Sequence, residues 1–275
     1  MASEEINKIL ADMEKHGFPL EVRTSVTLQT YGWEVTNQAS YIDMDSKKNR
    51  TIDIIAEKNV ILNSSKLGFD IWLFIECKKA QKPWVFYTSD MDLTKEDIRR
   101  KVVSSAHVDI NSLAYQQRKQ NIVSDIILRQ FLLEKKLSKS FFAKIAYSSF
   151  EPFTKGKGLS INKARMQVCN AILDVERKID SEILPTIDFP YGLLFLPIIV
   201  LDGQLLTYEN GKLSFSDGLY YHVPYHGDAF LIEIITANFL ETYLKKIEFL
   251  TTNFKYEYLP EVELNSGQKE TQTKR

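Results

Sequence analysis

The sequence predicts an α/β protein in which helices flank a mixed β-sheet, and three observations support this. Two strongly apolar segments, residues 71–77 and 193–201, are typical of buried strands. Residues 161–183 carry apolar side chains at steps of three and four, which indicates a long amphipathic helix. A chain of 275 residues, 44% of them hydrophobic, is long enough for a large core. Because no Pro-, Ser- or Gly-rich linker divides it, we expect one extended domain over residues 1–260.

The first part of the chain is expected to form two helices and then consecutive strands. Ser3 can cap a helix that Gly17 ends, and Pro19 suits the first turn of a second helix. That second helix should run to about residue 31, where extended structure begins. The strands and the turn between them are then expected at residues 33–42, 43–49 (the turn), 50–56 and 71–77.

The middle of the chain is expected to be helical and its end mixed. The helices and the short strand expected here lie at residues 94–100, 110–137, 141–147 (the strand) and 161–183. The strand at 193–201 should turn back at Asp202-Gly203 as a hairpin, and a strand at 230–235 should lead into a last helix. This hairpin and helix would extend a core that ends near residue 150. Residues 261–275 lack apolar periodicity, so we expect a disordered tail.

Composition excludes several classes of protein. The acidic N-terminus lacks the apolar core of a signal peptide, and the longest apolar run of 11 residues is shorter than the ~20 that a membrane helix requires. We therefore expect neither secretion nor a membrane partner. The two cysteines, Cys77 and Cys169, belong to no CxxC pair, so neither a disulfide scaffold nor a structural zinc site is expected. The expected compartment is the cytoplasm.

The net charge of −1 hides a strong asymmetry along the chain. Residues 95–178 contain 17 basic and 8 acidic side chains, a difference of +9, whereas residues 180–263 contain 4 basic and 13 acidic ones, a difference of −9. Phosphate backbones attract the first kind of surface and repel the second. The pattern is compatible with a polyanionic partner, and equally with two solvated helix faces.

Two of the expected strands carry the side chains on which the functional interpretation depends. Because side chains alternate along a strand, Glu76 and Lys78 lie side by side on one face at the end of the second of these strands. We expect this charged pair at the rim of the sheet, because burial without partners would be costly. In the first strand, Asp53 points away from the face that Ile52 and Ile54 share. If the two strands are antiparallel neighbours, Asp53 meets Glu76 at about 5 Å between Cβ atoms.

Two carboxylates at that distance repel unless a cation neutralises them. Mg²⁺ prefers hard oxygen ligands and keeps several waters, and a metal-bound water can attack phosphorus. Asp53 and Glu76 are therefore the candidate metal ligands, for Mg²⁺ or for Mn²⁺ in its place. Lys78 is the candidate donor that orients the attacking water or stabilises the transition state. The alternative is that the three side chains form a salt bridge at the rim of the sheet, and Cys77, on the opposite face, is expected to be core rather than nucleophile.

The pattern FPLE…YGWEV…RTIDIIA…ECKK…KPWVF resembles the PD-(D/E)XK, or restriction-endonuclease-like, nuclease superfamily, and within it a group of bacterial proteins. In that superfamily an Asp on one strand and a Glu/Asp-x-Lys on the next form the metal site; here Asp53 precedes Glu76-Cys77-Lys78 by 23 positions. The resemblance covers residues 18–90, with weaker agreement at 196–205. It implies a restriction-endonuclease-like core over residues 18–150 and a Mg²⁺-dependent deoxyribonuclease that acts on DNA, as an endonuclease rather than an exonuclease.

The resemblance also implies a further acidic residue. The superfamily core begins with a helix that often contributes a glutamate, and Glu21 is the natural match. Glu14 and Glu34 are alternatives from the same region. The residue before Asp53 is Ile52 and not the proline of the superfamily pattern, a position at which many members vary.

Basic residues that follow the motif are candidates for contact with the DNA backbone: Lys79, Lys82, Arg99 and Arg100. Solvated surfaces explain these charges equally well, and Trp84 and Phe86 among them are expected to be core residues. The rival interpretation of the whole chain is a catalytically inactive nucleic-acid- or protein-binding module on the same fold. The sequence leaves a homodimer open.

Overall fold

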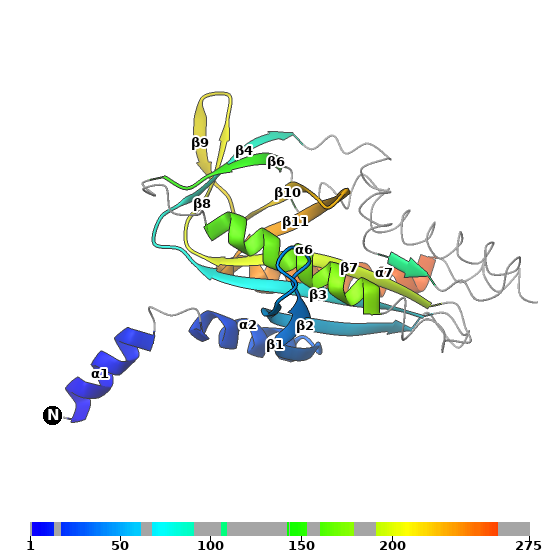
Figure 1. The fold of residues 1–275 in the computed structure, drawn as a ribbon, viewed down its shortest axis with the longest axis horizontal. Helices are drawn as coiled ribbons and strands as arrows, with labels where there is room; N and C mark the ends of the chain where they lie inside the picture. Colours follow the sequence, from blue (N-terminus) through cyan, green and yellow to red (C-terminus); the bar gives the residue numbers. More distant parts are fainter. Residues whose placement is uncertain are drawn as a thin grey trace, which may run out of the picture.

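A computed structural model describes residues 2–13, 18–61, 68–90, 106–108, 142, 144–152, 160–178 and 191–257. Over these residues the fold is α/β: eleven strands form one large mixed sheet, and helices lie against both of its faces (Figure 1). The predicted fold class is therefore confirmed at this level. The helices expected at 94–100 and 110–137, the tail at 261–275, and Arg99 and Arg100 lie outside the described residues.

The strands that follow one another along the chain range from 3 residues in β5 to 13 in β2. The first group is α1 (Ala2–Met13), α2 (Phe18–Thr30), β1 (Glu34–Ile42), β2 (Asn49–Ile61), β3 (Gly68–Lys79) and β4 (Trp84–Asp90). The second group is β5 (Ala106–Val108), β6 (Lys144–Phe150), α6 (Ser160–Lys178), β7 (Tyr191–Asp202), β8 (Leu205–Glu209), β9 (Lys212–Phe215), β10 (Gly218–Tyr225), β11 (Asp228–Thr236), the 3₁₀ turn η4 (Ala237–Phe239) and α7 (Leu240–Glu257). The sequence analysis named no strand at the position of β10.

The strand order shows how the C-terminal half completes the sheet. The order is β1-β2-β3-β7-β11-β10-β6-β4-β8-β9, and β5 pairs with β7. β1, β2 and β3 form an antiparallel meander, and β7 lies parallel to β3 along its whole length. β7, β11 and β10 therefore separate β3 from β4 and β6. The C-terminal strands are the middle of the sheet, which differs from the expected extension of a core that ends near residue 150.

The hairpin predicted at Asp202-Gly203 is wrong. β8 pairs with β4 and β9, whereas β7 pairs with β3, β5 and β11. The chain here runs alongside the β3–β4 connection: Ala80 N donates to Asp202 O at 3.0 Å, and Trp84 N donates to Gln204 O at 2.9 Å. A Cβ atom on Gly203 would lie 2.7 Å from Ala80 O. The glycine therefore permits a close approach of two segments rather than a tight turn.

Two buried clusters fill the two faces of the sheet. α2 and α7 cover one face, and α6 crosses the other, as Figure 1 shows. Each fully buried aliphatic side chain contributes roughly 1.5–3 kcal/mol of burial free energy, so the amphipathic face of α6 accounts for much of its attachment. The apolar residues of α6 with almost no exposed surface are Ile161, Ala164, Val168, Cys169, Ala171 and Ile172. None of the described helices combines the length and the apolar character that a membrane crossing needs.

The β1–β2 hairpin changes faces near its middle. Along β2, Ile54 belongs to the cluster beneath α2 and α7, whereas Ile52 belongs to the cluster beneath α6. Strict alternation would have placed both residues on one face, so that part of the sequence analysis is wrong. The exchange falls at Asp53, which lies opposite Gln38 in the β1–β2 register. Gln38 has a left-handed backbone with φ of 52°, and such a residue interrupts the regular alternation of a strand.

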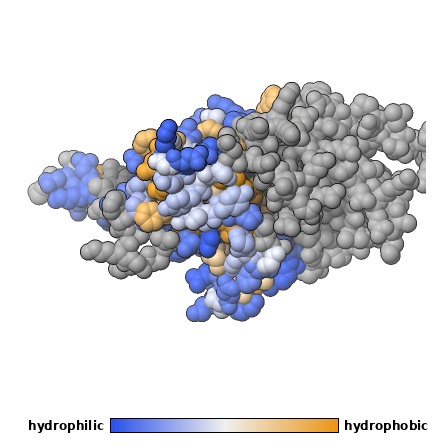
Figure 2. All heavy atoms as spheres, turned by 90° about the horizontal axis from the view of Figure 1, so that it is seen from above, coloured by the Kyte–Doolittle hydropathy of each residue, from blue (hydrophilic) through white to orange (hydrophobic). Residues whose placement is uncertain are grey.

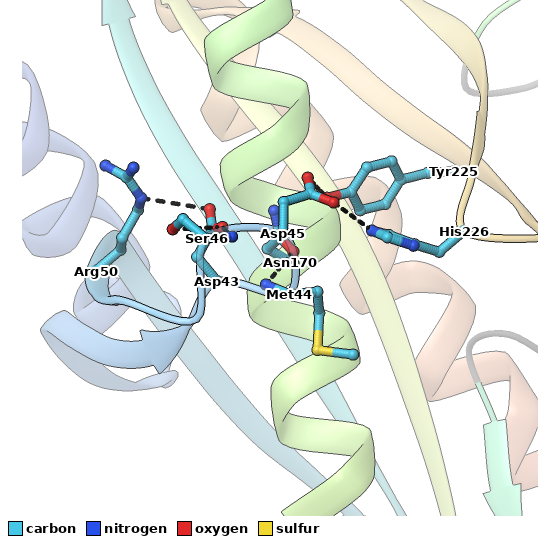
Figure 3. Close-up of polar contacts among 8 residues, drawn as sticks. All are labelled: Asp43, Met44, Asp45, Ser46, Arg50, Asn170, Tyr225 and His226. Atoms are coloured by element: carbon cyan, nitrogen blue, oxygen red, sulfur yellow. Dashed lines mark hydrogen bonds and ion pairs between the residues drawn. The ribbon is translucent and has the colours of Figure 1, made fainter.

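The tip of this hairpin is fastened across α6 to the β10–β11 turn (Figure 3). Met44 N donates to Asn170 Oδ1 of α6 at 3.0 Å. Asp45 accepts a hydrogen bond from the Tyr225 hydroxyl at 2.8 Å and contacts His226 Nε2 at 2.9 Å. Asp43 closes the turn itself by accepting from Ser46 N at 2.7 Å. These contacts hold the distal half of β2 against the α6 face.

The opposite end of the sheet carries exposed aromatic side chains. Tyr87 of β4 and Tyr208 of β8 contact each other with ring centroids 5.4 Å apart. Figure 2 shows hydrophobic residues interspersed with hydrophilic ones over the described part of the surface seen from above. The large exposed hydrophobic residues of β4, β6, β8 and β9 are Tyr87, Tyr147, Phe150, Tyr208, Leu213 and Phe215. Exposed apolar side chains on these strands are accompanied by charged ones such as Lys212.

Substitution of Gly203 tests how closely this residue approaches Ala80. Gly203→Ala should lower the free energy of unfolding by about 1–3 kcal/mol, because its Cβ would overlap the Ala80 carbonyl and force one segment to shift. Urea unfolding measures this change, with Ser214→Ala on the exposed strand β9 as the control. An unchanged unfolding midpoint in Gly203→Ala would show that the segments of Gly203 and Ala80 do not lie so close together.

Candidate functional site

The antiparallel pairing of β2 and β3 brings two of the predicted site residues together. Ile54 lies opposite Ile75, so the next residues along the two strands are Asp53 and Glu76. The expectation that these strands are antiparallel neighbours is confirmed. Asp53 Oδ2 accepts a hydrogen bond from Cys77 N at 2.8 Å, where the paired register has ended. A carboxylate thus takes the place of a main-chain acceptor, which fixes Asp53 beside β3.

Glu76 is buried, which the sequence analysis did not expect. Its exposed fraction is 0% and that of Asp53 is 9%. Lys78 Nζ contacts Glu76 Oε1, so these two side chains do form an ion pair. Glu76 Oε2, however, has no hydrogen-bond partner among the described residues. One oxygen of this buried carboxylate therefore contacts a cation, and we refer to the other, which lacks a partner among these residues, as the open oxygen.

Burial and charge shift the protonation of this carboxylate. The pKa of Glu76 is raised to about 7. Burial is the largest cause of this higher pKa, the negative charge of Asp53 acts in the same direction, and Lys78 opposes both. Burial and the charge of Asp53 also raise the pKa of Glu21. Carboxylates that repel in this way gain from a bound cation, because the cation restores the ionised forms.

Glu21 reaches the site from α2. Its Oε2 accepts a hydrogen bond from Gln38 Nε2 at 2.7 Å, and Gln38 is the left-handed residue opposite Asp53. The charges of Asp53 and Lys78 both act on Glu21. Glu34, one alternative for this role, lies opposite Glu57 in the β1–β2 register, toward the other end of the hairpin. Glu14, the other alternative, lies outside the described residues.

The donor set fits a hydrated divalent ion rather than an ion enclosed by protein. Among the described residues, no group of three or more His, Cys, Asp or Glu side chains is arranged to hold a metal. Two neighbouring carboxylates, one with a buried open oxygen, form the partial set that Mg²⁺ uses together with waters and substrate phosphates. Asp53 and Glu76 would hold such an ion, with Glu21 at its periphery.

Of the predicted DNA-contacting residues, Lys79 ends β3 and Lys82 lies in the β3–β4 connection, whereas Arg99 and Arg100 lie outside the described residues. Lys82 is exposed, and Lys79 Nζ lies 3.9 Å from Asp202 Oδ2. The same carboxylate oxygen lies 3.3 Å from Arg23 Nη2 of α2, a basic residue that the sequence analysis did not single out. No local signal could have found Arg23, because Asp202 follows it by 179 positions.

Three residues near the site are core residues, as expected. Trp84 is 1% exposed and Phe86 is 0% exposed. The Cys77 thiol lies 3.7 Å from the Thr24 hydroxyl, and burial raises its pKa well above the usual range. A buried neutral thiol is a poor nucleophile, so Cys77 contributes its backbone N–H and not its sulfur.

The pH dependence of stability tests the buried state of Glu76. In the ion-free protein its pKa rises from 4.5 to about 7 on folding, so the folded state binds more protons between these values. The contribution of Glu76 to the free energy of unfolding should be fully present below pH 4.5 and lost as the pH rises through 7. At about 1.4 kcal/mol per pKa unit, the loss is about 3 kcal/mol.

Urea unfolding of wild type and Glu76→Gln between pH 4 and 8 measures this contribution as the difference between the two slopes. Glu241→Gln, an exposed change at the start of α7, is the control. Equal pH slopes for wild type and Glu76→Gln would contradict the burial of an ionisable Glu76.

Two substitutions of Asp53 separate its structural role from ion binding. Asp53→Asn keeps an oxygen that accepts from Cys77 N and relieves repulsion with Glu76, so stability should be preserved or raised. Asp53→Ala leaves a buried N–H without its acceptor and should lower stability by about 1–3 kcal/mol. Urea unfolding measures stability, and calorimetric titration with Mn²⁺ should show loss of binding in both variants. Unchanged Mn²⁺ binding in Asp53→Asn would exclude Asp53 as a ligand.

Comparison of the chain with protein-family models, with curated proteins and with solved structures finds no match in any of the three.

Proposed function

We propose that this protein is a Mg²⁺-dependent nuclease that hydrolyses phosphodiester bonds of DNA, with internal cleavage favoured. The observation that carries the proposal is the meeting of Asp53 with Glu76 on adjacent strands, beside Lys78 and with Glu76 Oε2 open. The choice of DNA and of internal cleavage rests on the resemblance of the Asp53…Glu76-Cys77-Lys78 pattern to restriction-endonuclease-like nucleases.

Each side chain has a distinct part in the proposed reaction. Asp53 and Glu76 hold the ion, which when bound supplies an acidified water and neutralises charge on the scissile phosphate. Asp53 is fixed for this by its bond to Cys77 N, which occupies Oδ2. Glu21, held by Gln38, adds negative charge at the edge of the site. This pair of anchored carboxylates is a preorganised ligand set, so little order has to be gained on binding.

Lys78 supplies the positive charge that the reaction needs at a fixed place. An ammonium group has three hydrogen-bond donors, and the contact with Glu76 Oε1 uses one of them. The others can orient the attacking water and donate to the phosphate oxygens, on which charge develops in the transition state. Because the pair is largely buried, this charge is weakly screened by solvent.

Basic residues beside the site support a polyanionic substrate. Arg23 is 59% exposed and Lys79 33%, and Asp202 lies within 4 Å of both, so one carboxylate holds two cations near the end of β3. Lys82 follows in the exposed β3–β4 connection. Such residues neutralise phosphates and make binding salt-dependent. They fit a backbone that passes this end of the sheet.

Nicking of supercoiled plasmid in the presence of Mg²⁺ tests the proposal. Wild type should convert plasmid to open-circle and linear forms, and chelation of the ion should stop the conversion. Lys78→Met should reduce the rate by at least about 100-fold, because it removes the donor for the transition state. Lys212→Met, at the exposed end of β9, removes an equal charge far from the site and should cut at the wild-type rate.

The same assay distinguishes the rival functions. A panel of single-stranded DNA, RNA and nucleotide esters identifies the substrate class. Wild-type protein that binds DNA but shows no ion-dependent cleavage of any of these would overturn the nuclease and leave a binding module on this fold. Equal rates for wild type and Lys78→Met would remove Lys78 from the mechanism.

A further inference from the structure

Tyr41 is a buried residue beside the candidate site that has no part in the mechanism above. It lies on β1, three residues beyond Gln38, where the hairpin has already exchanged faces. Its exposed fraction is 2%, and it belongs to the cluster beneath α6 together with Ile52 and Phe74. Phe74 and Glu76 alternate onto the same face of β3. Tyr41 and Glu76 therefore point into the same side of the sheet.

Among the buried polar atoms that have no hydrogen-bond partner within the described residues, two concern this pair of side chains. One is the Tyr41 hydroxyl and the other is Glu76 Oε2. Buried hydroxyls and carboxylates are nearly always hydrogen-bonded to protein or to ordered water. One atom is a donor and the other an acceptor, so a single water that bridged them would satisfy both.

Electrostatics agrees with this arrangement. Burial is the largest cause that raises the pKa of Tyr41 above its ordinary value, and the charge of Glu76 is the next; Asp43 and Asp53 add to it, and Arg50 opposes it. Glu76 therefore acts on this hydroxyl more strongly than Asp43, which is only two positions away on the chain. The phenol keeps its proton near neutral pH and is available as a donor.

We propose that Tyr41 is a positioning residue of the candidate site: its hydroxyl donates to a buried water, and this water donates to Glu76 Oε2. The inference rests on the proposed function, because Oε2 has a second lone pair and is the oxygen that would bind the ion. Together with Lys78 on Oε1, the water fixes the carboxylate from both sides. Partners that orient a ligating carboxylate in this way typically change metal affinity by about 10–100-fold when they are removed.

Tyr41→Phe removes the hydroxyl and keeps the ring. Calorimetric titration with Mn²⁺ should show a dissociation constant raised by about 10-fold or more, and plasmid nicking at saturating Mn²⁺ should fall with little change in the KM for DNA. The matched control is Tyr221→Phe. Tyr221 is 3% exposed in the same cluster, but its hydroxyl lies 3.3 Å from Ser149 Oγ and 3.4 Å from Arg165 Nη1. Its Mn²⁺ affinity should match that of wild type.

The outcomes separate this inference from the proposed function. Wild-type Mn²⁺ affinity in Tyr41→Phe overturns the positioning role and leaves the nuclease proposal standing. Equal losses in Tyr41→Phe and Tyr221→Phe also overturn it, because the effect would then belong to the cluster and not to this hydroxyl. A wild-type protein that binds no Mn²⁺ overturns both proposals. Urea unfolding of each variant confirms that the compared proteins are folded.

Discussion

The candidate site depends on one hydrogen bond, from Cys77 N–H to Asp53 Oδ2. Up to Ile54 and Ile75, β2 and β3 are joined by their main chains. Beyond that point β2 belongs to a hairpin that has exchanged faces, and a side chain must supply the acceptor that β3 needs. The residue that maintains the sheet at this point therefore also presents a carboxylate to Glu76. A structural requirement and a chemical one meet at Asp53, and the second oxygen of each carboxylate remains for the chemistry.

The sequence predicted the relation between Asp53, Glu76 and Lys78 because it needed only two facts: strand alternation and antiparallel pairing of two consecutive strands. It failed at Ile52, where one left-handed residue, Gln38, reverses the alternation, and no pattern of residue types marks that position. The hairpin predicted at Gly203 was also wrong, because an Asp-Gly pair occurs where two chain segments lie close together as well as in a tight turn. Contacts such as that of Arg23 with Asp202 join distant segments and leave no local signal.

The burial of Glu76 has a topological cause. The sequence suggested a rim position, because two charged residues follow an apolar strand. β7, however, pairs with β3 as far as Lys79, and α6 covers the face that Phe74 and Glu76 share. The charged end of β3 is thus enclosed by a strand and a helix that lie more than 80 positions later in the chain. Burial raises the pKa of Glu76, and Oε2 has no hydrogen-bond partner among the described residues, so a ligand or a buried water would offset the cost of burying it.

The placement of β7 has a consequence for fragments of the chain. A polypeptide that stops before residue 191 contains all four of Glu21, Asp53, Glu76 and Lys78, yet it lacks the neighbour that pairs with β3 from Gly68 to Lys79. Such a piece would display a long, apolar and unprotected strand border, which is a template for self-association. All four side chains would then be present in a chain that aggregates. Formation of the candidate site therefore requires synthesis of the chain well past Lys78, the last of these four residues.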